Sequence, residues 1–289
     1  MTQRHVVVGV DGSAGSRAAL GWAIGLGQTF GAEVVAVHAV GLLEDLGAHP
    51  VAGRDRLADL RRLVEEAWCD QLRAAGGPYR IELRDGSPLD VIKAATESER
   101  AAVLVVGSRG TGGQPALALG STSLALLQVV RVPVLVVPEG AAAPGRDGGL
   151  ALRHILVGID RSPPSLAALD LAADVARATG ATMTVLEVTG DEDGPARVGP
   201  LVDEVVADIR AGGVAVHRDV HAGDPAAVLL DQAEQTGADL VVVGTRGRGG
   251  PAAPLLGSVA RTVADGARRP TLVLPAAAGA VRLAPPAAA

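Results

Sequence analysis

A chain of 289 residues with 48% hydrophobic residues has the length of two ordinary domains and enough apolar material for a core in each. Its formal net charge of −6 argues against sequence-independent binding of nucleic acid. The only aromatic residues are Trp22, Phe30, Trp68 and Tyr79, too few for stacking platforms that bind single strands. The core must therefore be built from Val, Leu, Ile and Ala, as in helices packed on a parallel sheet.

Several chemistries lack the residues that they need. Lys93 is the only lysine, so the Gly-Lys-Ser/Thr tripeptide of a Walker loop is absent and Schiff-base chemistry has one poor candidate. Cys69 is the only cysteine, which excludes an intramolecular disulfide and a multi-cysteine zinc site. His5 and His154 precede the first strand of each half, and we expect both to be structural. The sequence offers no catalytic constellation.

The N-terminal residues 1–5 lead directly into an apolar strand and do not resemble a signal peptide. No apolar run reaches about 18 residues, the length of a membrane span. We therefore expect a cytoplasmic protein without a membrane partner.

Apolar runs and helical periodicities alternate along the first half of the chain. Helices are predicted over 14–31, over 54–75, from Pro88 onward and over 121–130, and residues 41–53 are predicted to be a loop. The predicted strands are 6–11, 33–40, 79–83, 102–107 and 133–138.

The second half repeats this order, with predicted strands at 154–160, 181–188, 214–220, 239–244 and 270–275. Equivalent residues of the two halves lie 149 positions apart up to the second strand and 137 positions apart from the third strand onward. The first half therefore has a longer connection between its second and third strands. We predict two domains, 1–138 and 153–276, with a linker at 139–152 and a disordered tail at 277–289. The fold class is α/β: two tandem doubly wound domains, each a five-stranded parallel sheet of order 3-2-1-4-5 flanked by helices.

A glycine pattern follows the fourth strand of each half. In the first half its members are Gly107, Ser108, Arg109, Gly110, Thr111, Gly112, Gly113, Gly120, Ser121 and Thr122. In the second half they are Gly244, Thr245, Arg246, Gly247, Arg248, Gly249, Gly250, Gly257, Ser258 and Val259. Nine residues separate the second landmark glycine from the third in both halves. Two copies at one offset make a turn-only interpretation improbable.

In a doubly wound sheet, ligands bind where the winding direction reverses, between strands one and four. This places Asp11 beside Gly107, and Asp160 beside Gly244. Glycine-rich backbone can form an anion nest, and the helix that opens after it favours phosphate. The sequence therefore predicts phosphate binding in each half. The two aspartates could contact a ribose hydroxyl or Mg²⁺, or simply cap the next helix.

The spacing Gly-x2-Gly-x9-Gly-Ser after strand four, with Val-Gly-x-Asp-x-Ser ending strand one, resembles the ATP-binding branch of the universal stress protein family. Both halves match, so the chain is similar to a tandem two-domain member. The resemblance implies that adenine lies near Gly9, Asp11 and Ala39 in the first domain, and near Gly158, Asp160 and Val188 in the second. It implies that ribose and phosphates meet the two glycine patterns, with Arg109 and Arg246 as phosphate partners or as solvated side chains.

The second half departs from the first at three places. Arg161 replaces Gly12, Pro163-Pro164 comes soon after it, and Val259 replaces Thr122. The second site is therefore predicted either to bind more weakly or to prefer a different number of phosphates. The family also pairs its domains through their last strands, which implies pairing of 134–137 with 271–274 and covers two apolar edges. A homodimer of the tandem chain is a further expectation.

The leading functional hypothesis is an ATP-binding stress-response regulatory protein with one nucleotide per domain, an unidentified protein partner and little or no turnover. No residue is placed by the sequence as a catalytic base or arginine finger. The alternative is a slow ATPase or an adenylyl-transfer enzyme on the same fold. A redox dinucleotide or flavin binder is disfavoured, because the spacing of Gly9, Gly12 and Gly15 is not Gly-x-Gly-x-x-Gly.

Overall fold

The computed structural model describes residues 4–41, 53–111, 119–141, 145, 149–189, 200–245 and 256–276. Contacts divide the chain into two compact units. The first unit comprises residues 1–130 and 137–149, and the second comprises residues 131–136 and 150–289. The predicted tail at 277–289 lies outside the described residues, as do 42–52 of the predicted loop.

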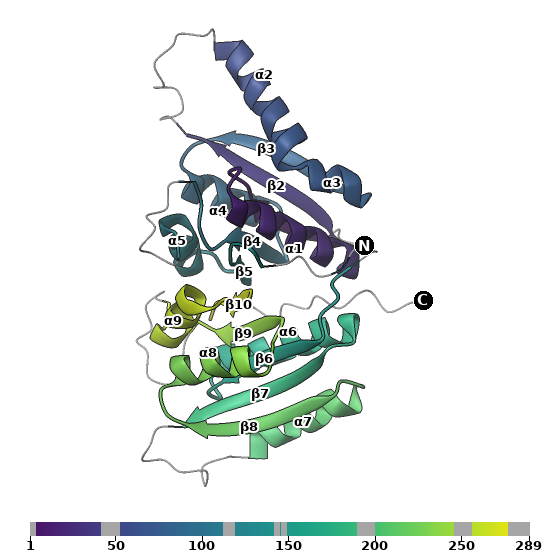
Figure 1. The fold of residues 1–289 in the computed structure, drawn as a ribbon, viewed down its shortest axis with the longest axis vertical. Coiled ribbons are helices and arrows are strands. Elements are labelled where there is room, and N and C mark those ends of the chain that lie inside the picture. Colours follow the sequence, from purple (N-terminus) through teal and green to yellow (C-terminus); the bar gives the residue numbers. More distant parts are fainter. Residues whose placement is uncertain are drawn as a thin grey trace. The chain divides into compact units, whose positions relative to one another are not determined.

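The first unit alternates strands and helices as predicted (Figure 1). Its strands are β1 (His5–Gly9), β2 (Glu33–Val40), β3 (Tyr79–Asp85) and β4 (Val103–Gly107). Its helices are α1 (Ala14–Phe30), α2 (Gly53–Leu63), the π-helix η2 (Val64–Trp68), α3 (Asp70–Ala75), α4 (Pro88–Ser98) and α5 (Ser121–Val129). The helix α1 packs on β1 and β4 and against α3, whereas α4 packs on β1 and β2 and against α5. The switch of faces follows β3, as doubly wound topology requires.

The second unit repeats this order (Figure 1). Its strands are β5 (Val134–Val137, of which 134–136 belong here), β6 (His154–Ile159), β7 (Thr182–Thr189), β8 (Val216–Ala222), β9 (Leu240–Gly244) and β10 (Thr271–Leu274). Its helices are α6 (Pro163–Thr179), α7 (Pro200–Ala211), α8 (Pro225–Gln235) and α9 (Ser258–Gly266). The helix α6 packs on β6 and β9, and α8 packs against α9.

The predicted fold class is confirmed. The strands run in the order β3-β2-β1-β4-β5 in one half and β8-β7-β6-β9-β10 in the other. The strand β1 pairs in parallel with β2 and β4, and β6 pairs in parallel with β7 and β9. In the second unit β5 pairs antiparallel with β10, with Leu135 opposite Leu272. The central strands are fully buried and aliphatic, which explains their unbroken apolar runs.

Serine or aspartate side chains cap the N-termini of α1, α4, α6 and α8, and left-handed glycines end α1, α3 and α6. Ser13 and Ser87 cap α1 and α4, and the side chain of each accepts a hydrogen bond from the backbone three residues later. Gly31 ends α1 in the left-handed conformation, with φ of 62°. These caps satisfy backbone groups that the helices leave open, and they explain why the predicted boundaries match the observed ones closely.

The single helix predicted over 54–75 is wrong. The backbone N–H of Cys69 donates to the carbonyl of Val64 at 2.9 Å, which is the wider hydrogen bond of a π-turn. Cys69 then leaves the helical region with φ of −114° and ψ of 18°, and α3 starts at Asp70. The spacing of apolar residues predicts that this segment is helical. It does not reveal that one turn of the helix holds an extra residue.

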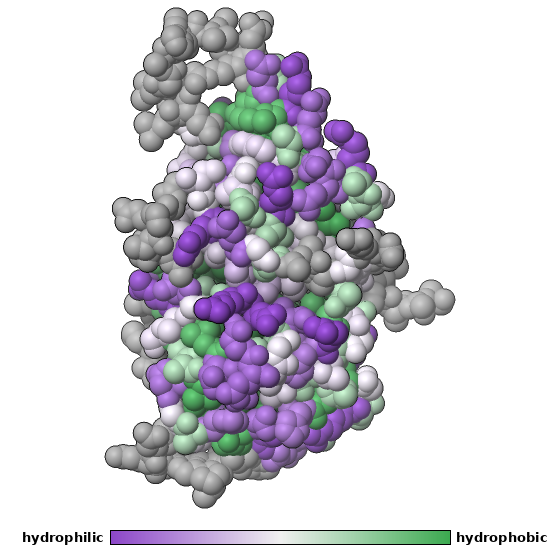
Figure 2. All heavy atoms as spheres, viewed as in Figure 1, coloured by the Kyte–Doolittle hydropathy of each residue, from purple (hydrophilic) through white to green (hydrophobic). Residues whose placement is uncertain are grey.

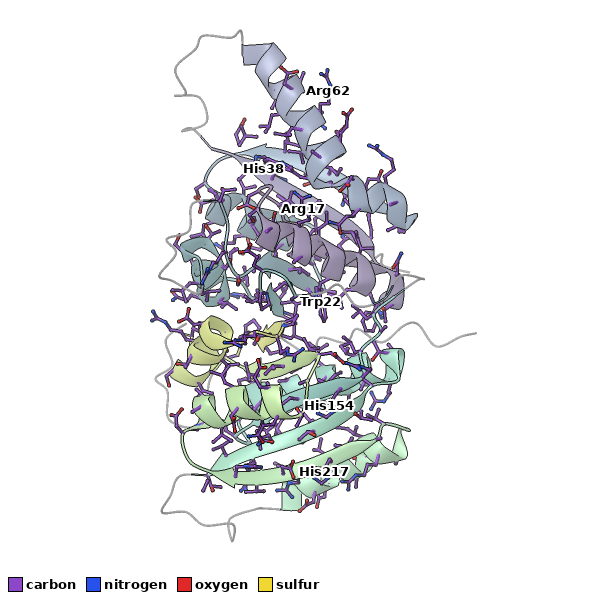
Figure 3. The ribbon with its side chains drawn as sticks, in the orientation of Figure 1. Arg17, Trp22, His38, Arg62, His154 and His217 are labelled. Atoms are coloured by element: carbon purple, nitrogen blue, oxygen red, sulfur yellow. The ribbon has the colours of Figure 1, made fainter. Side chains whose placement is uncertain are left out.

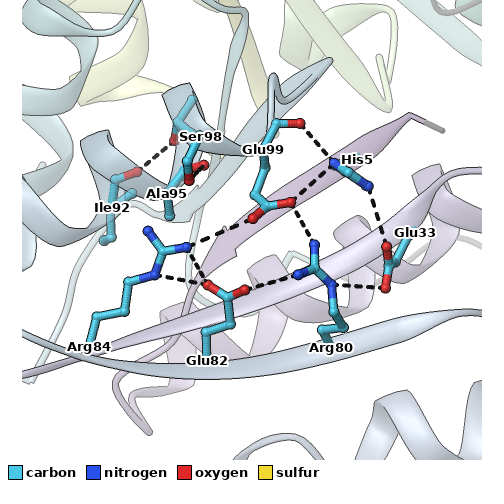
Figure 4. Close-up of polar contacts among 10 residues, drawn as sticks. His5, Glu33, Arg80, Glu82, Arg84, Ile92, Ala95, Ser98 and Glu99 are labelled. Atoms are coloured by element: carbon cyan, nitrogen blue, oxygen red, sulfur yellow. Dashed lines mark hydrogen bonds and ion pairs between the residues drawn. The ribbon is translucent and has the colours of Figure 1, made fainter. Parts of the chain in front are cut away.

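A charged cluster covers the end of the first sheet that lies opposite the carboxyl ends of its strands (Figure 4). His5 contacts Glu33 and Glu99 at 3.3 Å each, and its Nδ1 is 2.7 Å from the Glu99 carbonyl. Arg80 bridges Glu33 and Glu99 at 3.0 and 2.5 Å. His5 therefore fastens β1 to β2 and to the end of α4, which supports its predicted structural role.

The face in Figure 2 is mainly hydrophilic, with hydrophobic side chains scattered over it. The exposed large hydrophobic residues in the described ranges are Leu57, Leu63, Tyr79, Val129 and Leu201. Within the described part of the chain, none of the helices has both the length and the apolar character of a membrane span.

Candidate functional site

A cavity of about 360 Å³ opens at the carboxyl ends of β1, β2 and β4 in the first unit. This is the crevice where the winding direction reverses, as predicted. The residues that line it are Gly9, Val10, Asp11, Ser16, Val37, His38, Ala39, Pro88, Ile92, Val106, Gly107, Arg109, Gly110, Thr111, Gly120, Ser121, Thr122, Ser123 and Leu126. Its volume lies in the usual range for small-molecule sites.

The structure brings most of the predicted first-domain residues to this cavity. They are Gly9, Asp11, Ala39, Gly107, Arg109, Gly110, Thr111, Gly120, Ser121 and Thr122. Ser108 is buried and does not line the cavity; its backbone N–H donates to the Val137 carbonyl at 2.7 Å instead. Gly112 and Gly113 lie outside the described residues. Ser108 therefore fixes the start of the glycine loop rather than facing a ligand.

Asp11 joins the loop after β1 to the glycine loop after β4. One carboxylate oxygen accepts the Thr111 backbone N–H at 2.9 Å, and the other accepts that of Ser13 at 3.0 Å. Burial of the carboxyl would raise its pKa, but the hydrogen bonds from Ser13, Thr111 and Ser16 outweigh it, and the pKa of Asp11 lies below its ordinary value of 3.8. Asp11 is therefore a stable anion that organises both loops.

Two glycines of the loop approach other groups closely: Gly107 faces backbone, which leaves no room for a Cβ, and Gly110 faces the Asp11 carboxylate, which would have to move to admit one. A Cβ on Gly107 would lie 2.6 Å from the carbonyl carbon of Gly15 at the start of α1. A Cβ on Gly110 would lie 2.5 Å from the Asp11 carboxylate. Both distances are shorter than real Cβ contacts. The glycines therefore allow the loop to close on α1 and Asp11.

The start of α5 presents backbone donors to the cavity. Its N-cap, Gly120, has no side chain that could accept from the first turn, and Ser121 and Thr122 line the cavity. Two hydrogen bonds hold this helix end in place: Gly120 N–H donates to the Ser108 carbonyl at 2.7 Å, and the Ser123 hydroxyl donates to the Gly107 carbonyl at 2.7 Å. Uncapped first-turn N–H groups and the helix dipole favour an anion here.

Nine lining residues were not predicted from the sequence: Val10, Ser16, Val37, His38, Pro88, Ile92, Val106, Ser123 and Leu126. The apolar ones form the wall between β2, β4 and the helices on that face. His38, on β2, is labelled in Figure 3 and lies with its Nδ1 2.8 Å from the Val10 carbonyl. A signal for Ser16 was present, because Asp-x-Ser-x-x-Ser occurs in both halves, at Asp11 and at Asp160.

The second unit repeats the framework of this site. Thr245 N–H donates to the Leu274 carbonyl at 2.7 Å, and Gly257 N–H donates to the Thr245 carbonyl at 2.6 Å, as Ser108 and its partners do in the first unit. Asp160 accepts from the backbone and hydroxyl of Ser162 at 3.0 and 2.6 Å. Five predicted residues lie outside the described ranges: Arg246, Gly247, Arg248, Gly249 and Gly250.

The remaining predicted residues of the second unit take equivalent places on the same elements. Gly158 lies on β6, Val188 lies near the end of β7, Gly244 ends β9, and Gly257, Ser258 and Val259 form the start of α9. A Cβ on Gly244 would lie 2.8 Å from the carbonyl carbon of Pro164, as Gly107 meets Gly15. The repeated packing explains the repeated sequence pattern.

Arg161 makes the second unit different. It has a φ of 63°, close to the 78° of Gly12, so an arginine occupies a left-handed position that glycine holds in the first half. Its guanidinium lies 2.6 Å from Glu187, which is 93% buried at the side chain and stands on β7 where His38 stands on β2. Arg218 also contacts Glu187, at 3.4 Å. An ion-paired carboxylate therefore occupies the place that His38 holds in the first unit.

Acidic and histidine side chains are sparse around the cavity. Among the lining residues that the structure describes, Asp11 is the only carboxylate and Arg109 the only guanidinium. Across the described ranges, no group of three or more His, Cys, Asp or Glu side chains is arranged to hold a metal ion. A magnesium ion would need ligand oxygens, such as phosphates, in addition to Asp11.

A doubly wound unit with a parallel sheet and a glycine loop beside its first strand belongs to a class of folds that bind small molecules at this crevice. The model of the universal stress protein family matches residues 2–138 and 151–275. The chain is 34% identical to a universal stress protein of Mycolicibacterium smegmatis, covering 94% of this chain and 97% of that one. It is 31% identical to one of Mycobacterium tuberculosis, covering 93% and 95%.

A solved structure agrees with this comparison. The crystal structure of a universal stress protein from Archaeoglobus fulgidus has a TM-score of 0.73 and 23% identity, covering 95% of this chain and 99% of that one. This structural similarity shows that the two chains share the same fold. The chain belongs to the universal stress protein family and carries two of its domains in tandem.

Proposed function

We propose that the first unit binds ATP in the cavity beside Asp11, and that occupancy acts as a regulatory signal. The observation that carries the proposal is the meeting, in one cavity, of the glycine loop, the uncapped start of α5 and the Asp11 carboxylate. An anionic group suits the helix end, and a hydroxyl-rich group suits the carboxylate. A nucleotide offers both.

The lining residues fit the parts of a nucleotide. The backbone N–H groups and hydroxyls of Ser121 and Thr122 would hold phosphates, with Arg109 as a charged partner. Asp11 would accept from the ribose or contact Mg²⁺ that arrives with the phosphates. The apolar wall of Ile92, Val106 and Leu126, with the backbone of 37–39, would hold the base.

The site favours binding over turnover. Asp11 has a lowered pKa and already accepts two backbone hydrogen bonds, so it is a weak general base. His38 is the other lining residue whose side chain can act as a general base, but its Nδ1 is directed at the Val10 carbonyl. Turnover above about 1 s⁻¹, at the low end of ordinary enzymes, would favour the alternative of a slow ATPase or adenylyl-transfer enzyme.

The second unit is proposed to hold a second nucleotide more weakly. The backbone hydrogen bonds that the second unit repeats support binding there. The Arg161–Glu187 ion pair replaces Gly12 and His38, and Val259 removes the hydroxyl that Thr122 offers in the first unit. We also propose that the protein is cytoplasmic, forms a homodimer and pairs its domains through their last strands. A protein partner would recognise the nucleotide-bound form. The antiparallel register of β5 and β10 supports the strand pairing.

Titration calorimetry with ATP tests the assignment. Gly110→Val should abolish binding at the first site, because even the Cβ of the new side chain would meet the Asp11 carboxylate. Gly77→Val is the matched control, since a Cβ there meets nothing within 4 Å. Gly247→Val serves for the second site. Binding of ATP that survives in the double variant Gly110→Val, Gly247→Val would refute the proposed sites.

A further inference from the structure

Trp68, which does not line the cavity, lies against the loop that carries Asp11. A Cβ on Gly12 would overlap the Trp68 indole, at 2.7 Å from Nε1 and 2.8 Å from Cζ2. Gly12 also has a φ of 78°, in the left-handed region. The indole therefore packs on bare backbone directly after Asp11; the space beside it requires glycine there, and the left-handed conformation favours it.

The same indole contacts β2 on the other side of this loop. The rings of Trp68 and His38 meet edge to face, with centroids 5.0 Å apart and an angle of 78°. His38 in turn lies 2.8 Å from the Val10 carbonyl, and both residues line the cavity. The Trp68 side chain thus contacts both the loop after β1, at Gly12, and the strand β2, at His38.

Trp68 owes its position to the π-turn. The π-helix η2 ends at Trp68, and the hydrogen bond from Cys69 to Val64 closes it. One inserted residue rotates every later side chain by about 100° relative to an uninterrupted helix. The turn therefore directs Trp68 toward Gly12 while α3 continues to pack against α1. Single π-turns recur at functional sites.

The second unit shows the same loop braced differently. Arg161 stands where Gly12 stands, and its own guanidinium reaches Glu187, the counterpart of His38. The brace there is ionic: the loop supplies Arg161, and Arg218 on β8 contacts Glu187 as well as Asp203 of α7. In the first unit the brace is an indole from the segment 53–75. Only the first half has the longer connection that supplies this segment.

We propose that Trp68 is a positioning residue that couples occupancy of the first-unit cavity to the conformation of the segment 53–75. The proposal rests on the proposed nucleotide binding. A ligand that contacts Asp11 or His38 shifts the groups on which Trp68 packs, and by thermodynamic linkage the packing of Trp68 alters ligand affinity equally. Binding of a ligand in the cavity would then change the conformation of the segment 53–75, which a partner could detect.

Fluorescence tests the coupling, because the chain has only two tryptophans. Trp22 is buried on α1 and lies outside the cavity lining, so Trp22→Phe leaves Trp68 as the single reporter. The full-length variant is titrated with ATP, and binding is measured separately by equilibrium dialysis. We expect the Trp68 emission to change with the midpoint that dialysis gives for the tighter site.

Two further measurements keep the test independent of that variant. In the wild-type chain, ATP should slow alkylation of Cys69, the buried neighbour of Trp68. Trp68→Phe should weaken ATP binding by about fivefold, the low end of typical coupling, without loss of the folded state in circular dichroism. The matched control, Tyr79→Phe, alters an aromatic residue outside the cavity and should leave affinity unchanged.

The outcomes separate the two proposals. ATP binding in dialysis with unchanged emission and unchanged Cys69 alkylation would overturn the coupling and leave nucleotide binding intact. Unaltered affinity in Trp68→Phe would overturn it as well. Absence of ATP binding in dialysis would overturn nucleotide binding and, with it, the coupling.

Discussion

The carboxylate of Asp11 accepts a hydrogen bond from the backbone of Thr111, 100 residues away in the sequence, at 2.9 Å. This bond closes the loop after β1 onto the loop after β4. The cavity lies where these two loops meet, and the Asp11 carboxylate is one of the groups that hold them together.

Asp11→Ala should lower both stability and ATP affinity. Its removal leaves the Thr111 and Ser13 donors without their acceptor, which costs about 1–3 kcal/mol for partly buried groups. Urea unfolding and calorimetry measure the two effects. Asp90→Ala, at an exposed position of α4, is the control. Equal effects from both variants would contradict the role given to Asp11.

The lowered pKa of Asp11 predicts how its contribution depends on pH. A carboxyl whose folded pKa lies below the unfolded value of 3.8 stabilises the fold fully above that value. The contribution is lost as the pH falls from about 3.8 through the folded pKa. Unfolding free energies of wild type and Asp11→Asn should therefore converge in acid, and a constant difference down to pH 2 would contradict this.

His154 predicts a second pH dependence at a higher value. Burial lowers the pKa of its imidazole below 6.5, and the nearby Asp239 carboxylate only partly offsets this. The unfolded chain then binds the proton more readily, so stability should fall as the pH drops below about 6.5 toward the folded pKa. His154→Gln should flatten this slope in urea unfolding, whereas His217→Gln, exposed on β8, should leave it in place.

Gly15→Ala should destabilise the first unit by about 1–3 kcal/mol, the usual cost of overpacking. The added methyl group would lie 2.5 Å from the Arg109 carbonyl, which belongs to rigid backbone. Gly77→Ala offers the comparison, because its methyl group meets nothing within 4 Å. Thermal unfolding of both variants decides the matter, and equal midpoints would contradict the packing described for α1 and the glycine loop.

Cys69 should react slowly in the native protein. Burial, together with the Asp70 and Glu65 carboxylates, raises the pKa of the thiol to about 12, so almost no thiolate exists at neutral pH. Alkylation at pH 8 should be far slower in buffer than in 6 M guanidinium chloride. Similar rates in both solutions would show that the segment around η2 is open in the folded chain.

The sequence predicted the layout of the fold because its strands are unbroken aliphatic runs and its helices carry ordinary caps. Ser13, Ser87 and Gly31 mark boundaries through local chemistry, which a linear reading can recognise. The π-turn at Val64–Trp68 could not be predicted in this way, since its apolar spacing fits a continuous helix. The residue that the turn directs toward Gly12, Trp68, meets it only in the folded chain, and apolar spacing carries no sign of that contact.

The site was predictable in outline for a similar reason. Repeated glycines and Asp11 locate the crevice, because topology brings the ends of β1 and β4 together. The apolar wall was not predictable, since residues such as Ile92 and Leu126 read as ordinary core positions. The burial of Ser108 and the pairing of Arg161 with Glu187 depend on contacts between distant elements, which no local pattern encodes.

Photolabelling with 8-azido-ATP, followed by peptide mass spectrometry, tests the central claim most directly. The label should attach to the first-unit peptides that line the cavity, around residues 37–39 and 106–111, and excess ATP should prevent it. Gly110→Val should lose this labelling, while Gly77→Val should retain it. Labelling that falls on other surfaces, or that persists in Gly110→Val, would contradict a nucleotide site beside Asp11.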